Sequence, residues 1–123
     1  MANEISYTGK LSVTKGGTTV TNVTSTDSID MSGTSMLTIV QSIGTTYEAL
    51  TLTDIDTAAK YFVLLRNKDA TNYVEVSFDA GTTYSLRMEA GEICGPLPMV
   101  AGEQIGCRAN TAACDVEVVA CES

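Results

Sequence analysis

Four cysteines are the side chains of this chain with the widest choice of chemistry. They stand in its last third, at Cys94, Cys107, Cys114 and Cys121. Zinc sites favour cysteines two to four residues apart, whereas the spacings here are 13, 7 and 7 residues, so the pattern predicts no metal site. A nucleophilic cysteine needs a base or a cation beside its sulfur. Arg108 follows Cys107 directly but should point to the other face of the strand, so we expect no cysteine catalysis.

Two of the cysteines flank an expected turn at residues 110–111. If that turn is symmetric, Cys107 and Cys114 face each other across a hairpin, and a disulfide could join them. The alternative is that both are reduced and buried as small apolar side chains, which is commoner in a protein made in the cytosol. The sequence favours the second alternative and leaves both open. Cys121 should point away from Cys114, because seven is an odd number of residues along a strand.

Carboxylates form two small groups along the chain. Asp54 and Asp56 stand near Glu48, and Asp27 stands three residues before Asp30. Calcium takes six to eight oxygen ligands, and neither segment has the glycine-punctuated density of a calcium loop. A pair of carboxylates could hydrolyse glycosides, but such enzymes need a walled cleft, which a chain of 123 residues without tryptophan is poorly equipped to build. We therefore interpret both groups as solvated loops.

The overall composition excludes several further classes of function. Histidine is absent, which removes the commonest general base and the commonest metal ligand. The formal net charge is -8, which argues against nucleic acid and anionic membranes as partners. The longest apolar run, Tyr61 to Leu65, is far shorter than the roughly 20 residues of a membrane span. We expect a protein that is not an enzyme, takes no cofactor and is made in the cytosol.

The elements that carry these residues should be strands. Threonine supplies 18 of the 123 residues, and 14 of them lie between Thr8 and Thr57; its β-branched side chain favours strands over helices. Short strands follow one another every 8–12 residues or so, with no alternation of strands and helices. The sequence predicts one domain over residues 1–123. Its fold class is all-β: an antiparallel β-sandwich, or jelly-roll-like domain, of about eight to ten short strands.

Particular segments have particular expected places in this sandwich. The apolar run at 60–66 should be a buried central strand that forms a hairpin with 73–78. The run at 36–43 should be a strand covered on both faces, and residues 53–60 are the one stretch that could form a helical turn, with Thr53 or Asp54 as its N-cap. Two prolines at 96 and 98 confine their segment to a sheet edge or a crossing. The repeated Ala-Gly-Glu at 90–92 and 101–103 predicts two similar turns.

Three segments of the second half resemble a known class of protein. They are the run from Tyr61 to Val76 (YFVLLRNKDATNYVEV), the segment from Leu86 to Glu92 (LRMEAGE) and the segment from Arg108 to Val118 (RANTAACDVEV). In this order they resemble motifs of small virion structural proteins of tailed bacteriophages. The resemblance covers about half of the chain, and it implies a β-sandwich without any catalytic motif.

The resemblance implies a role on the virus particle. It implies a capsid decoration or cement protein whose partner is the lattice of the major capsid protein and whose location is the outer surface of the capsid. We also expect self-association, as a homotrimer. The acidic charge disfavours contact with packaged DNA.

The N-terminal segment is where we expect the contact with that lattice. Ile5, Tyr7, Leu11 and Val13 alternate with polar residues, which predicts a strand or short hairpin, and residues 1–15 could be an extended arm or an edge strand. Because a terminal strand can add to the sheet edge of another chain, these four residues are the candidate interface.

A tail or head-fibre protein that binds host surface glycans is the alternative function. Sugar sites usually expose aromatic side chains, but this chain has no tryptophan. Its tyrosines and phenylalanines should mostly point into the core, which favours decoration over glycan binding.

Overall fold

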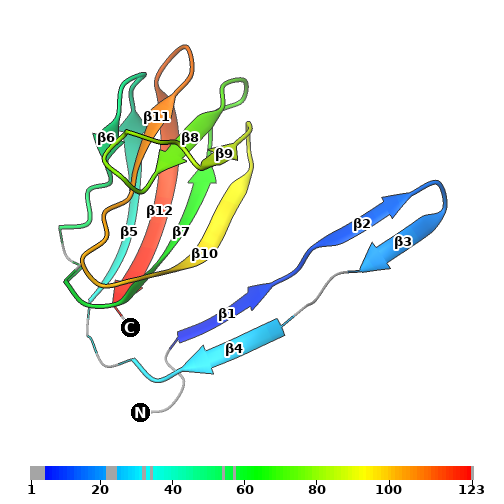
Figure 1. The fold of residues 1–123 in the computed structure, drawn as a ribbon, viewed down its shortest axis with the longest axis horizontal. Helices are drawn as coiled ribbons and strands as arrows, with labels where there is room; N and C mark the ends of the chain where they lie inside the picture. Colours follow the sequence, from blue (N-terminus) through cyan, green and yellow to red (C-terminus); the bar gives the residue numbers. More distant parts are fainter. Residues whose placement is uncertain are drawn as a thin grey trace.

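The computed structural model describes residues 5–21, 25–31, 33, 35–53, 55–56 and 58–122. Twelve β-strands and no helix occur in this part of the chain. Eight strands form two four-stranded sheets that face each other, and the other four form a long two-stranded ribbon that projects from the sheets (Figure 1). The expected all-β antiparallel sandwich is therefore confirmed, and the ribbon is an addition to it.

The first sheet has the strand order β10–β7–β12–β5, and all its neighbouring strands are antiparallel. The apolar run at 61–65 makes β7 a central strand, as predicted, because consecutive apolar residues place apolar side chains on both faces of a sheet. The prolines lie in edge strand β10, also as predicted, where no second neighbour needs their missing N–H groups. The strands are β5 (Met36–Ile43), β7 (Tyr61–Asn67), β10 (Ile93–Met99) and β12 (Cys114–Glu122).

The second sheet is smaller and has the order β6–β11–β8–β9. Its strands are short, and β8 and β9 form a hairpin in which Val74 pairs with Met88 and Val76 with Leu86. The turn at 90–92 and the turn at 101–103 are alike, as predicted, because Gly91 has φ 81° and Gly102 has φ 84°. The strands are β6 (Glu48–Ala49), β8 (Val74–Ser77), β9 (Leu86–Met88) and β11 (Gly106–Ala109).

The ribbon consists of two antiparallel ladders, β1 with β4 and β2 with β3. It turns at Gly16 and Gly17, which have φ 60° and 79°, the left-handed backbone that a two-residue hairpin loop needs. Paired threonines bond to each other across the ladders, Thr8 to Thr26 at 2.8 Å and Thr14 to Thr19 at 2.9 Å. The strands are β1 (Ile5–Gly9), β2 (Ser12–Lys15), β3 (Thr18–Thr21) and β4 (Ser25–Ile29).

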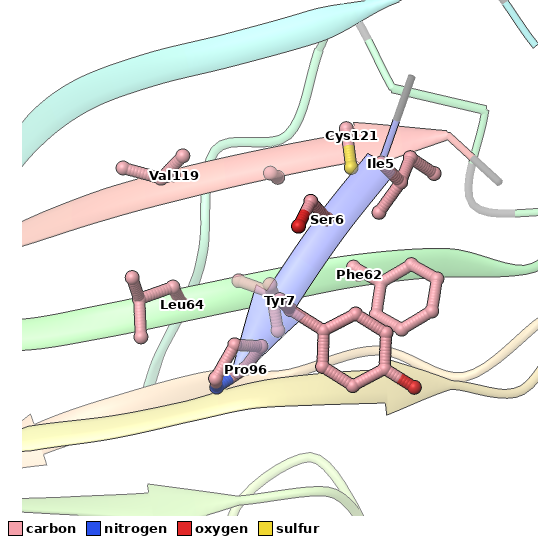
Figure 2. A pocket seen from close by; sticks show the side chains of 10 residues that line it. Ile5, Ser6, Tyr7, Phe62, Leu64, Pro96, Val119 and Cys121 are labelled. Carbon is pink, nitrogen blue, oxygen red and sulfur yellow. The ribbon is translucent and has the colours of Figure 1, made fainter. Parts of the chain in front are cut away.

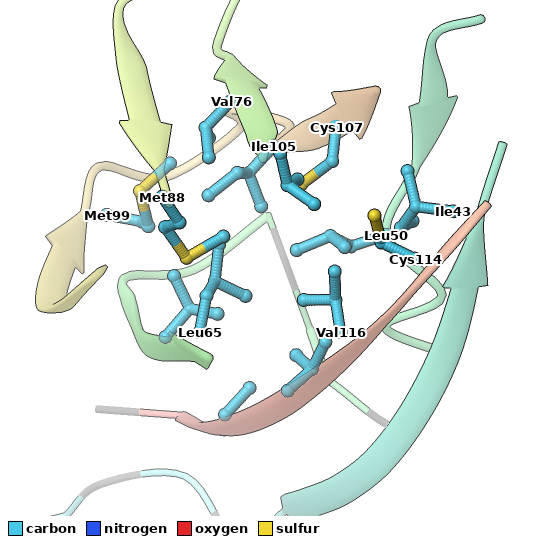
Figure 3. Packing of buried hydrophobic residues seen from close by; sticks show 14 of the residues in the cluster. Ile43, Leu50, Leu65, Val76, Met88, Met99, Ile105, Cys107, Cys114 and Val116 are labelled. Atoms are coloured by element: carbon cyan, nitrogen blue, oxygen red, sulfur yellow. The ribbon is translucent and has the colours of Figure 1, made fainter. Parts of the chain in front are cut away.

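The hydrophobic core fills the space between the two sheets (Figure 3). Both central strands of the first sheet contribute to it through alternate residues, including Leu65 of β7 and Val116 of β12, which are fully buried. Tyr61 is also buried, and its hydroxyl donates a hydrogen bond to the carbonyl of Glu103 at 2.7 Å. The core therefore depends on one face of each sheet, and the outer face of each sheet points away from it.

A buried amide ties the first sheet to two loops. The Nδ2 group of Asn67 donates to the carbonyls of Asn72, Met88 and Glu89 at 2.8, 3.2 and 3.2 Å. Its Oδ1 atom accepts the backbone N–H of Asp69 at 3.0 Å. Because Asn67 has no exposed surface, these bonds replace the water that its amide would otherwise bind.

Two hairpins expected from the sequence, 60–66 with 73–78 and the one around residues 110–111, are wrong. β7 and β8 lie in opposite sheets, and so do β11 and β12. In each case the connecting loop crosses the sandwich instead of reversing within one sheet. Alternation of apolar and polar residues fixes which face of a strand is buried, but a face can be buried equally well against a facing sheet, so the pattern does not select the hydrogen-bonded neighbour.

Two further expectations are corrected. β5 is an edge strand with one face in solvent, so it is not covered on both faces: Met36 is 73% exposed and Val40 is 54% exposed. The described residues of 53–60 form turns and bends and no helix, with a turn in which Ala59 N–H donates to the Asp56 carbonyl at 3.2 Å. Asp54, one of the two expected N-caps, lies outside the described residues.

Candidate functional site

The base of the ribbon lies on the outer face of the first sheet. We define the outer face as the side of that sheet turned away from the core. Figure 2 shows β1 crossing strands β7, β10 and β12 there. The ring of Tyr7 packs against the ring of Phe62, with centroids 5.2 Å apart. Between ribbon and sheet lies an apolar pocket of about 160 Å³, whose lining includes Ile5, Pro96 and Cys121.

Strand register shows which side chains share this outer face. Directly paired residues of antiparallel strands point to the same side. Cys121 pairs with Phe62 on one side and with Met36 on the other, and Val119 pairs with Leu64 in the same way. The face is therefore apolar over much of its area, although it belongs to the outside of the sandwich.

Exposed large apolar side chains concentrate in two places among the described residues. Four lie on the outer face and two lie on the ribbon, and the seventh is in the turn before β11. Scattered exposed apolar residues need no explanation, but a cluster marks a surface for another molecule. The seven are Met36, Val40, Ile93 and Val119 on the outer face, Leu11 and Val13 on the ribbon, and Val100 in the turn.

The four residues predicted as an interface are divided by the structure. Ile5 is 8% exposed, and it lies with the half-buried Tyr7 against the chain's own first sheet. Leu11 and Val13 are 59% and 54% exposed and have no such cover. Residues 1–4 of the expected arm lie outside the described residues, and the arm itself extends past residue 15 through the whole ribbon. Only Leu11 and Val13 are thus available to another molecule.

Charge is divided between ribbon and sandwich. The segment from Ile5 to Thr26 contains two lysines, Lys10 and Lys15, and no acidic residue. The rest of the chain contains all 15 acidic side chains and the other five basic ones. With Lys10 and Lys15 against Asp27 of β4, the ribbon is weakly cationic, and the sandwich is acidic. Sequence reasoning missed this division because it considered only the total charge, although the signal was present.

A row of aromatic and charged side chains occupies the second sheet. The guanidinium of Arg87 stacks on Tyr73 at 3.9 Å from the ring centroid, and that of Arg108 stacks on Tyr84 at 3.7 Å. Glu75 lies between the two arginines, 3.5 Å from Arg87 and 3.0 Å from Arg108. The expectation that the aromatic residues point mostly into the core was wrong for both tyrosines. One face of each of these two rings is already occupied by a guanidinium group, which leaves less ring surface for a sugar.

All four cysteines are free thiols. Cys107 and Cys114 do not pair across a hairpin, because β11 pairs with β6 and β8 whereas β12 pairs with β5 and β7. Both are buried within the core (Figure 3). Burial raises the pKa of the Cys107 thiol to about 12, and burial also raises the pKa of Cys121. Neither sulfur has the depressed pKa of a nucleophile.

The prediction that the carboxylates lie in solvated loops is wrong for Glu48, which lies in β6, and for Asp27, which lies in β4, and is right for Asp56. Glu48 accepts the backbone N–H of Gly44, Asp56 accepts that of Ala58 at 3.0 Å, and Asp27 accepts the Tyr7 hydroxyl at 3.2 Å. Within the described ranges, no three cysteine, aspartate or glutamate side chains come together as a metal site would require.

Two wider observations complete the description of the site. No helix in the described part of the chain is long and apolar enough to cross a membrane. No protein-family model matches the chain, and it has no significant match among curated proteins or solved structures.

Proposed function

We propose that this protein is a non-enzymatic structural protein of a tailed-phage virion that decorates the outer surface of the capsid. The observation that carries the proposal is the ribbon: a two-stranded arm that projects from a sandwich and exposes Leu11 and Val13. Covering these exposed apolar side chains with another molecule would remove their surface from water, which favours binding. The three motifs that resemble virion proteins support the surface of a phage capsid as that other molecule.

The sandwich supplies the second requirement of such a role. A decoration protein is present in many copies and must keep a stable surface towards solvent. The acidic sandwich is repelled by the phosphates of packaged DNA, which supports a place outside the shell. The contact of Tyr7 with Phe62 on the outer face of the first sheet holds the arm on the sandwich. The arm then acts as the attachment element and the sandwich as its support.

Binding to empty capsids tests this function. Purified protein is incubated with expanded, DNA-free heads of a tailed phage and sedimented, and we expect it in the pellet at a fixed ratio to the capsid protein. Replacing Leu11→Asp and Val13→Asp together should reduce the bound amount at least about tenfold. Val100→Asp is the matched control, because Val100 is 64% exposed and belongs neither to the ribbon nor to a strand of the first sheet.

The alternative function gives the opposite result in the same experiment. If the protein stays in the supernatant with capsids but binds host cells, and if free sugars compete for that binding, the decoration proposal is wrong and glycan binding is supported. If it binds neither, both functions are excluded for the particles tested.

A further inference from the structure

We infer that the ribbon of one copy of this chain docks on the outer face of the first sheet of a second copy. The inference goes beyond attachment to a capsid, because it assigns the arm a second partner, another copy of this chain, and a specific surface on it. Both contacts would cover Val13, so a given arm makes one or the other at a time. It also concerns the protein alone. Its test therefore needs no virus particle.

The first argument is that the exposed apolar residues form two complementary sets. Apart from Val100, the exposed large apolar side chains of the described residues belong either to the ribbon or to the outer face. Neither set is covered within the chain. Contact between Val13 of one copy and Val119 of another would remove both from water, and apolar area taken out of water is the main source of affinity between proteins.

The second argument is that the chain already shows how the ribbon sits on this face. Within one copy, Ile5 and Tyr7 lie on Phe62 and beside Cys121, and Ile5 is almost fully buried by that contact. The uncovered part of the face continues this surface as a shallow hollow that Leu64, Ile93 and Val119 line together with the charged pair Arg66 and Glu117. A second ribbon would therefore meet the same kind of surface that the first one already covers.

The third argument is charge. The projecting part of the ribbon, from Gly9 to Thr21, carries Lys10 and Lys15 and no acidic residue, whereas Asp27 lies at the base of the ribbon in β4. The outer face offers Asp115 and Glu117 in the row of Val119, because these residues alternate along β12 on the same side, and Arg66 of β7 pairs directly with Glu117. A cationic ribbon is attracted to an acidic sandwich, which steers the two copies together and disfavours contact between two sandwiches.

The dimensions also fit. A strand rises about 3.3 Å per residue. The nine residues of β12 therefore span about 30 Å, and the ribbon extends about 23 Å from Gly9 to Gly16. A ribbon can thus lie along most of the sheet of a neighbour. Lys10 and Lys15 would then lie on either side of the apolar contact made by Leu11 and Val13.

Cross-linking between copies tests the contact directly. A photoreactive benzophenone amino acid replaces Val13 in the full chain, and isotope-labelled and unlabelled copies are mixed before irradiation. We expect mixed-isotope cross-links that map to β5, β7 or β12 of the second copy. The matched control is the same probe at Thr14, whose side chain points to the opposite side of the ribbon from Val13. The probe at Thr14 should give several-fold fewer mixed-isotope cross-links.

Association in solution provides the second measurement. Analytical ultracentrifugation of the purified protein should show a species larger than a monomer. Its dissociation constant should rise as salt is added, because salt screens the attraction between charges. Val13→Asp and Val119→Asp should each raise the dissociation constant at least about tenfold, whereas Val100→Asp should leave it unchanged. Circular dichroism checks that each variant is folded. Ile93→Asp, at a position 65% exposed on the edge strand, replaces Val119→Asp if the latter does not fold.

Three results would overturn the inference. The protein could be monomeric at every concentration, the Val13 probe could cross-link only to the outer face of its own copy, or an oligomer could form that neither aspartate weakens. None of these results touches the capsid-binding experiment. A protein that is monomeric alone but binds capsids through its arm would refute the docking between copies and retain the proposed function.

Discussion

The ring of Tyr7 lies against the ring of Phe62, with centroids 5.2 Å apart and planes inclined by 41°. This pair joins the ribbon to the sandwich, two parts of the chain that are more than fifty residues apart in sequence. The Tyr7 hydroxyl also donates to Asp27 of β4 at 3.2 Å. The same side chain thus holds the ribbon together and fixes it to the outer face.

Removing the Tyr7 ring should loosen the base of the ribbon. An aromatic pair contributes about 0.5–1.5 kcal/mol, so Tyr7→Ala should raise the reaction rate of the neighbouring Cys121 thiol with an alkylating reagent by about two- to tenfold. Mass spectrometry of peptides resolves the rate at Cys121. Tyr7→Phe is the control, because it keeps the ring and loses only the bond to Asp27. Equal rates in the Tyr7→Ala variant and the unchanged protein would show that the ring contact does not hold the ribbon down.

The buried amide of Asn67 should be the most sensitive polar position in the fold. Asn67→Ala removes the buried donor to three carbonyls, of which that of Glu89 keeps the backbone N–H of Glu92 as a partner. We expect the free energy of unfolding to fall by about 3 kcal/mol, measured by urea denaturation. Asn72→Ala, which loses the bond to Thr111 in an exposed loop, should cost about 1 kcal/mol or less. A smaller loss for Asn67→Ala than for Asn72→Ala would contradict this assignment.

Tyr47 presents the opposite case, because its hydroxyl is buried and has no hydrogen-bond partner. Tyr47→Phe should therefore leave stability unchanged or raise it by up to about 1 kcal/mol. Gly106→Ala should lower it by about 1–3 kcal/mol, since the added methyl group would overlap the Tyr47 ring. Thermal unfolding measures both. A loss of stability in Tyr47→Phe would reveal a partner for the hydroxyl.

Two aspartates should make stability depend on acid. Bonds from the backbone N–H groups of Asn72 and Thr71 lower the pKa of Asp69 below its usual 3.8, and bonds from Thr83 N–H and the Ser77 hydroxyl lower that of Asp79. A lowered pKa in the folded state stabilises the protein above pH 3.8, and this contribution is lost as the pH falls through the folded-state value. The urea concentration at half-unfolding should thus decrease as the pH is lowered below about 4. The decrease should be less steep for Asp79→Asn. Identical pH profiles for the two proteins would exclude a contribution from Asp79.

The cysteines should react in the order of their exposure. Cys94 and Cys121 are half-buried, and Cys107 and Cys114 are buried. Alkylation of the native protein should modify Cys121 and Cys94 first, and alkylation in denaturant should modify all four. The mass of the intact protein gives the number of modified thiols. A mass two hydrogens lower before any reduction, with two thiols refractory in denaturant, would establish a disulfide that the structure does not contain.

The sequence by itself determined the secondary structure and the character of each strand. Threonine-rich alternation predicted strands and no βα units, the apolar run at 61–65 predicted a central strand, and the prolines predicted an edge. The repeated Ala-Gly-Glu predicted two similar turns, because the positive φ angle at the third residue of such a turn favours glycine. Properties of this kind depend on neighbours along the chain, so they can be recognised in the sequence.

Only the tertiary structure decided which strands pair and which apolar residues remain exposed. β7 and β8 look like a hairpin by pattern but lie in opposite sheets, since burial against a facing sheet satisfies the same alternation. Ile5 and Leu11 look equivalent in sequence, yet Ile5 is covered by the first sheet while Leu11 is 59% exposed. That difference arises from where the ribbon meets the sandwich, a contact between distant residues that no local pattern encodes.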